Sequence, residues 1–149
     1  MTERSSLGTL IGLASSGVEK AHKQLQDLMN TRHNAELQLS TLLTYREDYA
    51  QRLQKAAQAG LTASNYHNFR QFIVTLDEAI LQQNKVVAQI DTKLENGRRH
   101  WFSEKRRLGS FEALMARQAL QARLRENRNE QRASDERSAS QLRRTWSSH

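Results

Sequence analysis

The sequence predicts an all-α protein in which two long helices fold back on each other as an antiparallel coiled-coil hairpin. Three observations predict it. The 149 residues contain no proline; apolar residues recur at alternating steps of four and three through both halves of the chain; and one short glycine-containing segment, 58–65, separates the two halves. With 37% hydrophobic residues and a mean hydropathy of −0.81, the chain can bury one stripe on each helix but cannot build a thick core.

The first helix is expected at about residues 4–58. Two interleaved series define its stripe, and they are apolar except at Arg32, Arg46 and Gly60. The first series is Leu7, Ala14, Ala21, Leu28, Ala35, Leu42, Tyr49 and Ala56, and the second is Ile11, Val18, Leu25, Arg32, Leu39, Arg46, Leu53 and Gly60. A heptad repeat that continues this far without a slip is typical of a coiled-coil seam rather than of an ordinary amphipathic helix.

The segment AAQAGLTASN at 56–65 contains signals that end one helix and begin another. Gly60 suits the left-handed position that follows a helix C-terminus, and Leu61 suits the apolar contact that comes next. Thr62 or Ser64 can then cap the second helix. We therefore place the tip of the hairpin near residues 58–65.

The second helix is expected at about residues 65–126. Its two series are Phe69, Leu76, Gln83, Ile90, Gly97, Glu104, Phe111 and Gln118, and Ile73, Ile80, Val87, Leu94, Trp101, Leu108, Met115 and Ala122. Residues 1–126 are therefore interpreted as a single antiparallel coiled-coil domain. Residues 127–149 lose the repeat and become charged and small, so we expect a frayed or disordered tail.

Pairing the two stripes from the tip sets small residues against large ones, as dense packing requires. The expected layers include Ala35 with Ile90, Leu28 with Gly97 and Ala14 with Phe111, together with Ala56 with Phe69, Tyr49 with Leu76 and Leu25 with Trp101. The two arginines within the stripe can pack their stems and reach outward, Arg32 to Asp91 or Glu95 and Arg46 to Asp77. Such residues commonly fix the register of a coiled coil.

The sequence offers little for catalysis. It has no cysteine, and its five histidines show neither an HExxH motif nor a paired i, i+4 spacing. It has no glycine-rich phosphate loop, and a two-helix hairpin provides no enclosed pocket for a small molecule. We expect a soluble protein that is not an enzyme and holds no cofactor or metal, and no apolar run reaches membrane-span length.

A formal net charge of +7 and a pI of about 10.2 make nucleic acid one possible partner. The densest basic stretches are 98–100 and 104–107. No stacking platform of aromatic residues accompanies them, and a basic helical end could equally enter an acidic protein socket. A basic coiled-coil adaptor for nucleic acid therefore stands as the alternative function.

Apolar residues near the predicted tip exceed what a two-helix seam can bury. Leu42 adjoins Leu43, Tyr45 lies one turn before Tyr49, and Phe72 adjoins Ile73. One stripe can be buried while its neighbour stays exposed, and contiguous exposed apolar surface usually marks a protein contact. The other interpretation is that the seam rotates enough to bury both stripes.

Four segments carry a resemblance to a known family. They are LGTLIGLA at 7–14, LQLSTLLTYREDY at 37–49, NYHNFRQFIVTLDEAI at 65–80, and W-x3-K-x2-L from Trp101 to Leu108. In this combination the chain resembles the FliJ family of flagellar type III export proteins. The resemblance covers most of the chain.

The resemblance implies a cytoplasmic antiparallel coiled coil, similar to the stalk subunit of rotary ATPases, peripherally associated with the inner membrane at the flagellar base. Its partners would be the hexameric export ATPase, the membrane export gate and export chaperones, with no nucleic acid or small molecule. The family's conserved surface corresponds here to Gln38, Leu42, Tyr45, Tyr49, Phe72, Leu76 and Ala79. Position 83, often His in that surface, is Gln83. Leu42, Tyr49 and Leu76 also belong to the seam series, so the sequence leaves open whether they are core or surface.

Overall fold

The computed structural model describes residues 2–148, and the side chains of residues 6–148, as two helices. Helix α1 spans Thr2–Gln58 and helix α2 spans Ala63–Ser147, and the described residues form no strand. The all-α hairpin expected from the sequence is therefore confirmed. The chain divides into two compact units, Val18–Glu104 (the hairpin unit) and a terminal unit of residues 1–17 and 105–149. We describe each unit separately.

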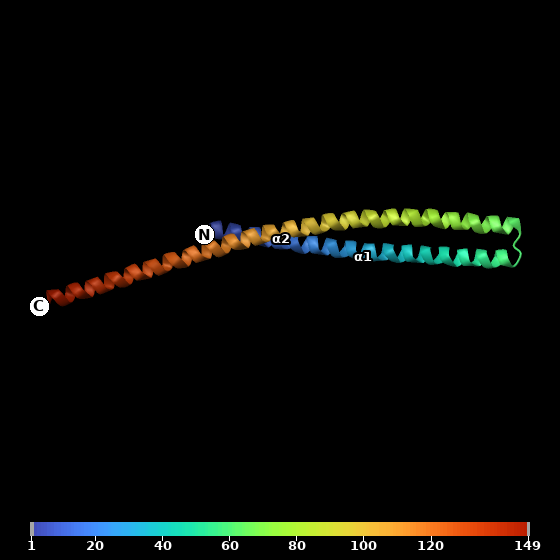
Figure 1. The fold of residues 1–149 in the computed structure, drawn as a ribbon. Coiled ribbons are helices and arrows are strands. Elements are labelled where there is room, and N and C mark those ends of the chain that lie inside the picture. The colour runs from blue at the N-terminus through green and yellow to red at the C-terminus, as the bar shows by residue number, and fades with distance from the viewer. Residues whose placement is uncertain (1, 149) are drawn as a thin grey trace. The chain divides into compact units, whose positions relative to one another are not determined.

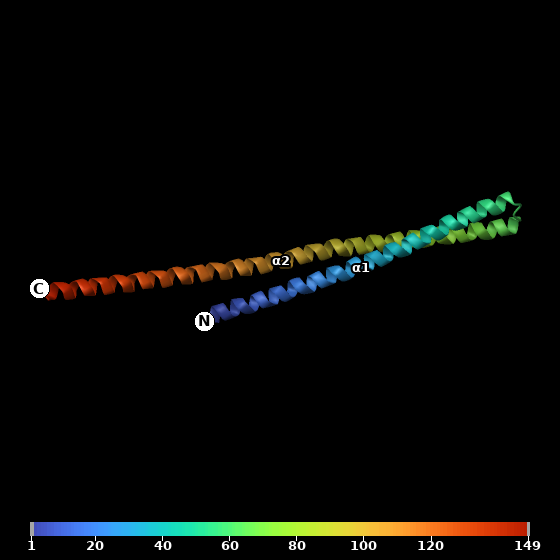
Figure 2. The same ribbon diagram turned by 90° about the horizontal axis from the view of Figure 1, so that it is seen from below.

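The loop of the hairpin unit lies where the sequence places it (Figures 1 and 2). Gly60 has a φ of 91°, a left-handed backbone conformation that glycine adopts without steric cost. The Gly60 N–H donates to the Ala57 carbonyl at 3.4 Å, and the Ala59 N–H donates to the Lys55 carbonyl at 3.1 Å. The Thr62 hydroxyl accepts from the Asn65 N–H at 3.3 Å, which caps α2. Of the two caps considered, Thr62 is the one observed.

The seam of the hairpin unit follows the predicted heptads. Ala35, Ile90 and Leu94 form its buried cluster, and Leu25, Leu28 and Val87 pack against it. A Cβ placed on Gly97 would lie 3.4 Å from a Leu25 Cδ atom and 3.5 Å from a Leu28 Cδ atom, so glycine lets the two helices approach closely at this layer. The expected pairs Ala35 with Ile90 and Leu28 with Gly97 are therefore confirmed.

The terminal unit has a smaller apolar core. Leu7 and Ala14 on α1 are buried, with exposed fractions of 5% and 1%, and Phe111 and Leu108 on α2 are half-buried. The Arg107 guanidinium lies 5.7 Å from the centre of the Phe111 ring. The burial of Leu7 and Ala14 follows the same heptad series as the hairpin unit.

The second helix does not end near residue 126 as expected, because α2 continues to Ser147. The sequence after Gly109 has no glycine or proline, and it is rich in alanine, arginine, glutamine and glutamate, which favour the helical backbone even without packing. From 123 to 148 every side chain is exposed except Ala139. Fraying of residues 127–149 in isolation and the single-domain organisation of 1–126 stay predictions.

Neither helix, over the residues that the structure describes, carries a stretch long and apolar enough to span a lipid bilayer.

Candidate docking surface

Seven residues of the hairpin unit were predicted as a contact surface, here named the tip-side surface: Gln38, Leu42, Tyr45, Tyr49, Phe72, Leu76 and Ala79. Gln38 and Tyr45 each precede a seam residue on α1, and Phe72 and Ala79 each precede one on α2. In an antiparallel pair these positions flank the same side of the seam. The set therefore forms one side of the hairpin rather than a ring around it.

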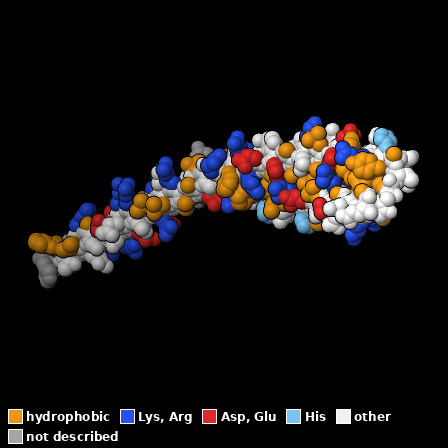
Figure 3. Space-filling view, turned by 45° about the vertical axis from the view of Figure 1, so that its right-hand side comes forward, with side chains coloured by type: hydrophobic (Ala, Val, Ile, Leu, Met, Phe, Trp, Pro, Cys, Tyr) orange, Lys and Arg blue, Asp and Glu red, His pale blue; other side chains and the backbone are white. Residues whose placement is uncertain are grey.

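Exposure separates the members of the tip-side surface. Tyr45 and Phe72 keep 54% and 42% of their surface exposed, whereas Leu76 keeps 7% and belongs to the core. Gln38 is exposed, and Leu42, Tyr49 and Ala79 are half-buried. The sequence left open whether Leu42, Tyr49 and Leu76 are core or surface. The structure places Leu76 in the core, whereas Leu42 and Tyr49 contribute to both the seam and the surface. Figure 3 shows apolar side chains gathered on the face of the hairpin unit near its loop.

Three aromatic rings, those of Tyr49, Phe69 and Phe72, pack against one another at this surface. The rings of Tyr49 and Phe72 lie 4.3 Å apart between centroids, tilted by 38°, and the Tyr49 and Phe69 rings lie 6.3 Å apart. The Arg52 guanidinium lies 5.5 Å from the centre of the Tyr49 ring. The Tyr49–Phe69 and Arg52–Tyr49 distances fall in the range of favourable aromatic and cation–π contacts, and the rings of Tyr49 and Phe72 lie slightly closer than that range. Packing of Phe72 against Tyr49 fixes an exposed ring from α2 against a half-buried ring from α1.

Gln83 joins the two helices at the other end of the tip-side surface. Its Nε2 donates to the backbone carbonyl of Ala35 at 2.9 Å and to the side-chain oxygen of Gln38 at 3.2 Å. An amide inside an apolar seam is stable when its donors are satisfied in this way. Gln83 therefore orients the Gln38 side chain from the opposite helix.

The other side of the hairpin unit is charged. The Arg32 guanidinium pairs with the carboxylates of Asp91 and of Glu36, the latter at 2.8 Å, and Arg46 pairs with Asp77. Asp91, Asp77 and Glu36 each follow a seam residue, which places them across the seam from the tip-side surface. The predicted reach of Arg32 and Arg46 to Asp91 and Asp77 is confirmed. Glu95 pairs instead with Arg99 at 3.5 Å and with Arg98 at 4.0 Å.

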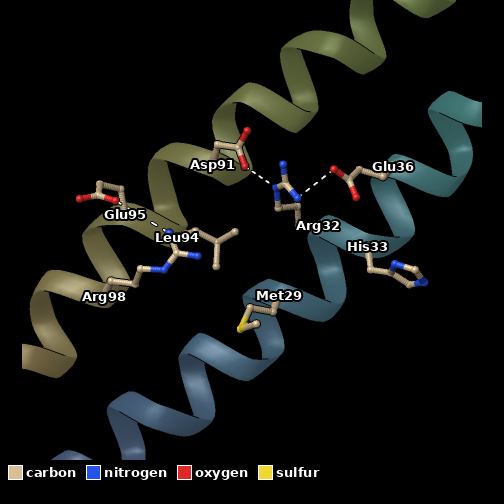
Figure 4. Close-up of a pocket in the computed structure, with 8 residues that line it drawn as sticks. All are labelled: Met29, Arg32, His33, Glu36, Asp91, Leu94, Glu95 and Arg98. Atoms are coloured by element: carbon tan, nitrogen blue, oxygen red, sulfur yellow. Dashed lines mark hydrogen bonds and ion pairs between the residues drawn. The ribbon is translucent and has the colours of Figure 1, made fainter.

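A hollow of about 530 Å³ lies on this charged side (Figure 4). Its lining is Met29, Arg32, His33, Glu36, Asp91, Leu94, Glu95 and Arg98. In the close-up Arg32 lies between Asp91 and Glu36, so its charge is already compensated by protein carboxylates. The hollow therefore presents paired charges around Arg32.

The neighbouring carboxylates change the pKa values of Arg32 and Arg46. The hydrogen bond that the Arg32 guanidinium donates to Asp91, together with the negative charge of that carboxylate, raises the pKa of Arg32 above its ordinary value, and Asp77 does the same for Arg46. A raised folded-state pKa on a base contributes stability that is fully present below the unfolded pKa and is lost only as pH rises through the folded value. Both arginines therefore stay charged and paired throughout the neutral range.

Among the side chains of residues 6–148 no three of His, Cys, Asp or Glu come together as a metal site. The hairpin unit carries exposed rings on one side, and on its other side charges that pair with each other.

Sequence reasoning missed Val86 and the contact made by Gln83 in this region. Val86, 40% exposed, precedes the seam residue Val87 and occupies the same heptad position as Phe72 and Ala79. That repeat position was the signal that could have found it. Gln83 was noted as a seam-series position of the family's surface at which His is common, but its hydrogen bond to the Ala35 carbonyl on the other helix was not predicted.

Comparison with known proteins gives consistent results. The Flagellar FliJ protein family matches residues 3–146. The Flagellar FliJ protein of Escherichia coli (strain K12) is 35% identical over 136 residues, which cover 91% of this chain and 92% of that protein. The Flagellar FliJ protein of Salmonella typhi is 32% identical over 136 residues with the same coverage. The match spans both units, and this chain therefore belongs to the Flagellar FliJ protein family.

Proposed function

We propose that this chain is a component of the flagellar protein export apparatus that acts as a stalk-like helical coupling element rather than as an enzyme. The observation that carries the proposal is the family match over residues 3–146. The two-sided hairpin supports it: its charged side is satisfied internally, while its tip-side surface exposes Tyr45 and Phe72. Exposed, well-packed aromatic side chains are common anchors of protein interfaces.

In this proposal the tip-side surface contacts the membrane export gate, and the terminal unit enters the hexameric export ATPase. The charge distribution supports such a division. Val18–Glu104 contains eleven basic and ten acidic residues, whereas the rest of the chain contains twelve basic and six acidic residues. Nearly all of the net charge of +7 thus lies in the terminal unit, as expected for a segment that enters an acidic protein socket.

Export chaperones are the third proposed class of partner, and the cytoplasmic face of the inner membrane at the flagellar base is the proposed location. A mechanical role of this kind needs long helices with a packed seam, which the hairpin unit has. It needs no catalytic group for that role.

The proposed function is tested by deleting the gene for this chain in the flagellated bacterium that encodes it. We expect secretion of flagellar subunits and swimming to fall strongly, and a plasmid copy of the wild-type chain to restore both. Normal secretion in the deletion strain would overturn the proposal.

The alternative function is that of a nucleic-acid adaptor. Measuring the affinity of the chain for DNA at increasing salt concentration distinguishes it from the proposed function. Affinity driven by phosphate contacts falls steeply with salt concentration, and the basic residues of 105–148 would supply those contacts. We expect the purified chain to bind duplex DNA only weakly and only at low salt. Tight DNA binding that persists at physiological salt would favour the adaptor.

A further inference from the structure

The glycines of the two units differ in their structural roles. In the hairpin unit, Gly60 has a left-handed backbone conformation, and Gly97 lets α1 side chains approach closely. In the terminal unit, Gly8 and Gly12 have neither reason, because a Cβ at either position would meet nothing within 4 Å and neither φ is positive. Both residues lie inside α1. Glycine at these positions only weakens the helix, since alanine in a helix interior is more favourable.

The composition around these two glycines weakens the same segment of α1 further. Residues 6–17, here named the strap, have the sequence SLGTLIGLASSG, in which seven of twelve residues are glycine, serine or threonine. Only four of the forty-one residues of 18–58 are of these types. Glycine, serine and threonine have lower helix propensity than alanine or leucine. The strap is therefore a weaker helix former than the rest of α1.

The strap packs on α2 within the terminal unit through a small apolar contact. Its buried side chains are Leu7 and Ala14, with exposed fractions of 5% and 1%, and an alanine side chain buries little apolar surface. The strap contains no charged residue. Its side chains therefore make no ion pair to α2 of the kind that Arg32 and Arg46 make in the hairpin unit. Both the helix propensity of the strap and its attachment to α2 are weak.

The α2 helix does not depend on the strap for its helical structure. From 123 to Ser147 it is helical although its side chains, except that of Ala139, are exposed. Residues 110–122 contain four alanines, two leucines and no glycine, so their helix propensity is high as well. The two helices of the terminal unit are therefore unequal, because the strap needs its partner helix and α2 does not.

We propose that the strap is a releasable cover: in a minor state of the chain it unfolds from α2, while α2 stays helical and the hairpin unit stays paired. Local opening of this kind occurs where a structure buries few apolar contacts. Release uncovers Leu108 and Phe111 of α2, which are half-buried when the strap is in place. The terminal unit thus has two states that differ in the apolar surface of α2. Release is a property of the chain itself, so its test needs no partner protein and is independent of the proposed function.

Cysteine labelling measures the release, because the chain contains no cysteine of its own. Ala14 and Ala21 lie one heptad apart in the same seam series, with exposed fractions of 1% and 2%. Ala14→Cys therefore reports the strap, and Ala21→Cys is its matched control in the hairpin unit. Under native conditions, Ala14→Cys should react with iodoacetamide at least about tenfold faster than Ala21→Cys, once each rate is divided by that of the same variant unfolded in urea. Equal rates would overturn the proposal.

The role of the glycines is tested by adding Gly8→Ala and Gly12→Ala to the Ala14→Cys variant. Each alanine should favour the helical strap by about twofold to fivefold, so together they should slow labelling at position 14 by about fivefold to thirtyfold. Gly109→Ala is the control. Its Cβ also meets nothing within 4 Å, but α2 is helical in both states, so labelling should change by less than about twofold. Labelling that Gly8→Ala and Gly12→Ala leave unchanged, or that Gly109→Ala slows as much, contradicts release of the strap alone.

Hydrogen exchange measures the same release in the unmodified chain, without an introduced cysteine. Backbone amides of the strap should exchange at least about tenfold faster than those of 110–122, because α2 keeps its helical hydrogen bonds when the strap leaves. In the Gly8→Ala/Gly12→Ala variant, exchange should slow in the strap and stay unchanged in 110–122. Equal protection of the two segments would mean that both helices of the terminal unit open together, and the releasable strap would then be wrong.

Discussion

Tyr45 and Phe72 differ from their neighbours in the seam because they expose large rings. Phe72 rests on Tyr49 at 4.3 Å between centroids, and Tyr45 keeps 54% of its surface exposed. Their removal takes apolar surface from a contact face without opening a cavity in the seam. Their contribution to binding can therefore be separated from their contribution to folding.

Changing either Tyr45 or Phe72 to Ala should leave melting nearly unchanged, within roughly 0.5 kcal/mol for Tyr45, because exposed substitutions are usually mild. Affinity for the export gate should fall by about tenfold or more, as for interface anchors. Circular dichroism melting and calorimetric titration measure the two effects. Leu94→Ala is the control: Leu94 is 3% exposed, so its truncation should cost about 2–5 kcal/mol in stability. If Tyr45→Ala melts at the temperature of Leu94→Ala, Tyr45 belongs to the seam.

Gly60 carries the one left-handed backbone conformation among the described residues. A Cβ at Gly60 would meet nothing within 4 Å, so the cost of a side chain there is a cost of backbone strain alone. Gly60→Val should destabilise the chain by about 1 kcal/mol or more. Gly109→Ala, in an open helical position, should be neutral or slightly stabilising. Unchanged melting of Gly60→Val would mean that the loop tolerates another conformation.

At the scale of the helices, the two arginine–aspartate pairs make the register of the hairpin specific. Arg32 and Arg46 are two heptads apart on α1, and Asp77 and Asp91 are two heptads apart on α2. A slip of one heptad would leave at least one arginine of the seam without its aspartate. Exposed pairs add little stability individually, so we attribute to them the choice of register rather than the strength of the seam.

A charge exchange tests this role. Arg46→Asp places a second carboxylate beside Asp77, and Asp77→Arg places a second guanidinium beside Arg46, so each single variant should melt at a lower temperature. The double variant Arg46→Asp/Asp77→Arg restores an opposite pair and should recover much of the loss. Crosslinking between cysteines introduced at 28 and 97 reports the register. A double variant that melts no higher than either single one would contradict the pairing.

The heptad pattern predicted the seam well because burial in a two-helix pair follows directly from position in the repeat. Ala35, Ile90 and Leu94 were placed in the core on that basis, and they are buried. The pattern could not decide Leu42 and Tyr49, because a seam side chain near the edge of a thin coiled coil is shared between core and surface. It also missed the extent of α2. Hydrophobic periodicity indicates where a helix is packed against a partner. The extension of α2 to Ser147 depends on helix propensity alone, which periodicity does not report.

For the molecule as a whole, the functional question is whether its two units act separately. Balanced charge and an exposed aromatic surface characterise Val18–Glu104, whereas an excess of basic residues characterises the terminal unit. The proposed gate and ATPase contacts therefore depend on different residues. A substitution or deletion that removes one of these two contacts should leave the other intact.

Truncation after Ala122 tests this separation. Apart from Ala139, the described side chains beyond Ala122 are exposed, so the shortened chain should fold with little change in melting of the remainder. Its affinity for the export gate should match the wild type, while its affinity for the export ATPase should fall. Tyr45→Ala should show the opposite pattern. Loss of both affinities in the truncated chain would mean that the two units bind as one.

The position of the Gly60 loop also has a consequence for how the chain reaches its native state. Residues on either side of the loop are near neighbours in sequence, so closing that end costs the least chain entropy, and each further layer of the seam adds to a structure already joined. Pairing should start near Tyr49 and Phe69 and advance toward Leu25 and Gly97, so that the tip-side surface is assembled early. Substitutions beside the loop should then slow refolding, whereas those near Gly97 should mainly speed unfolding.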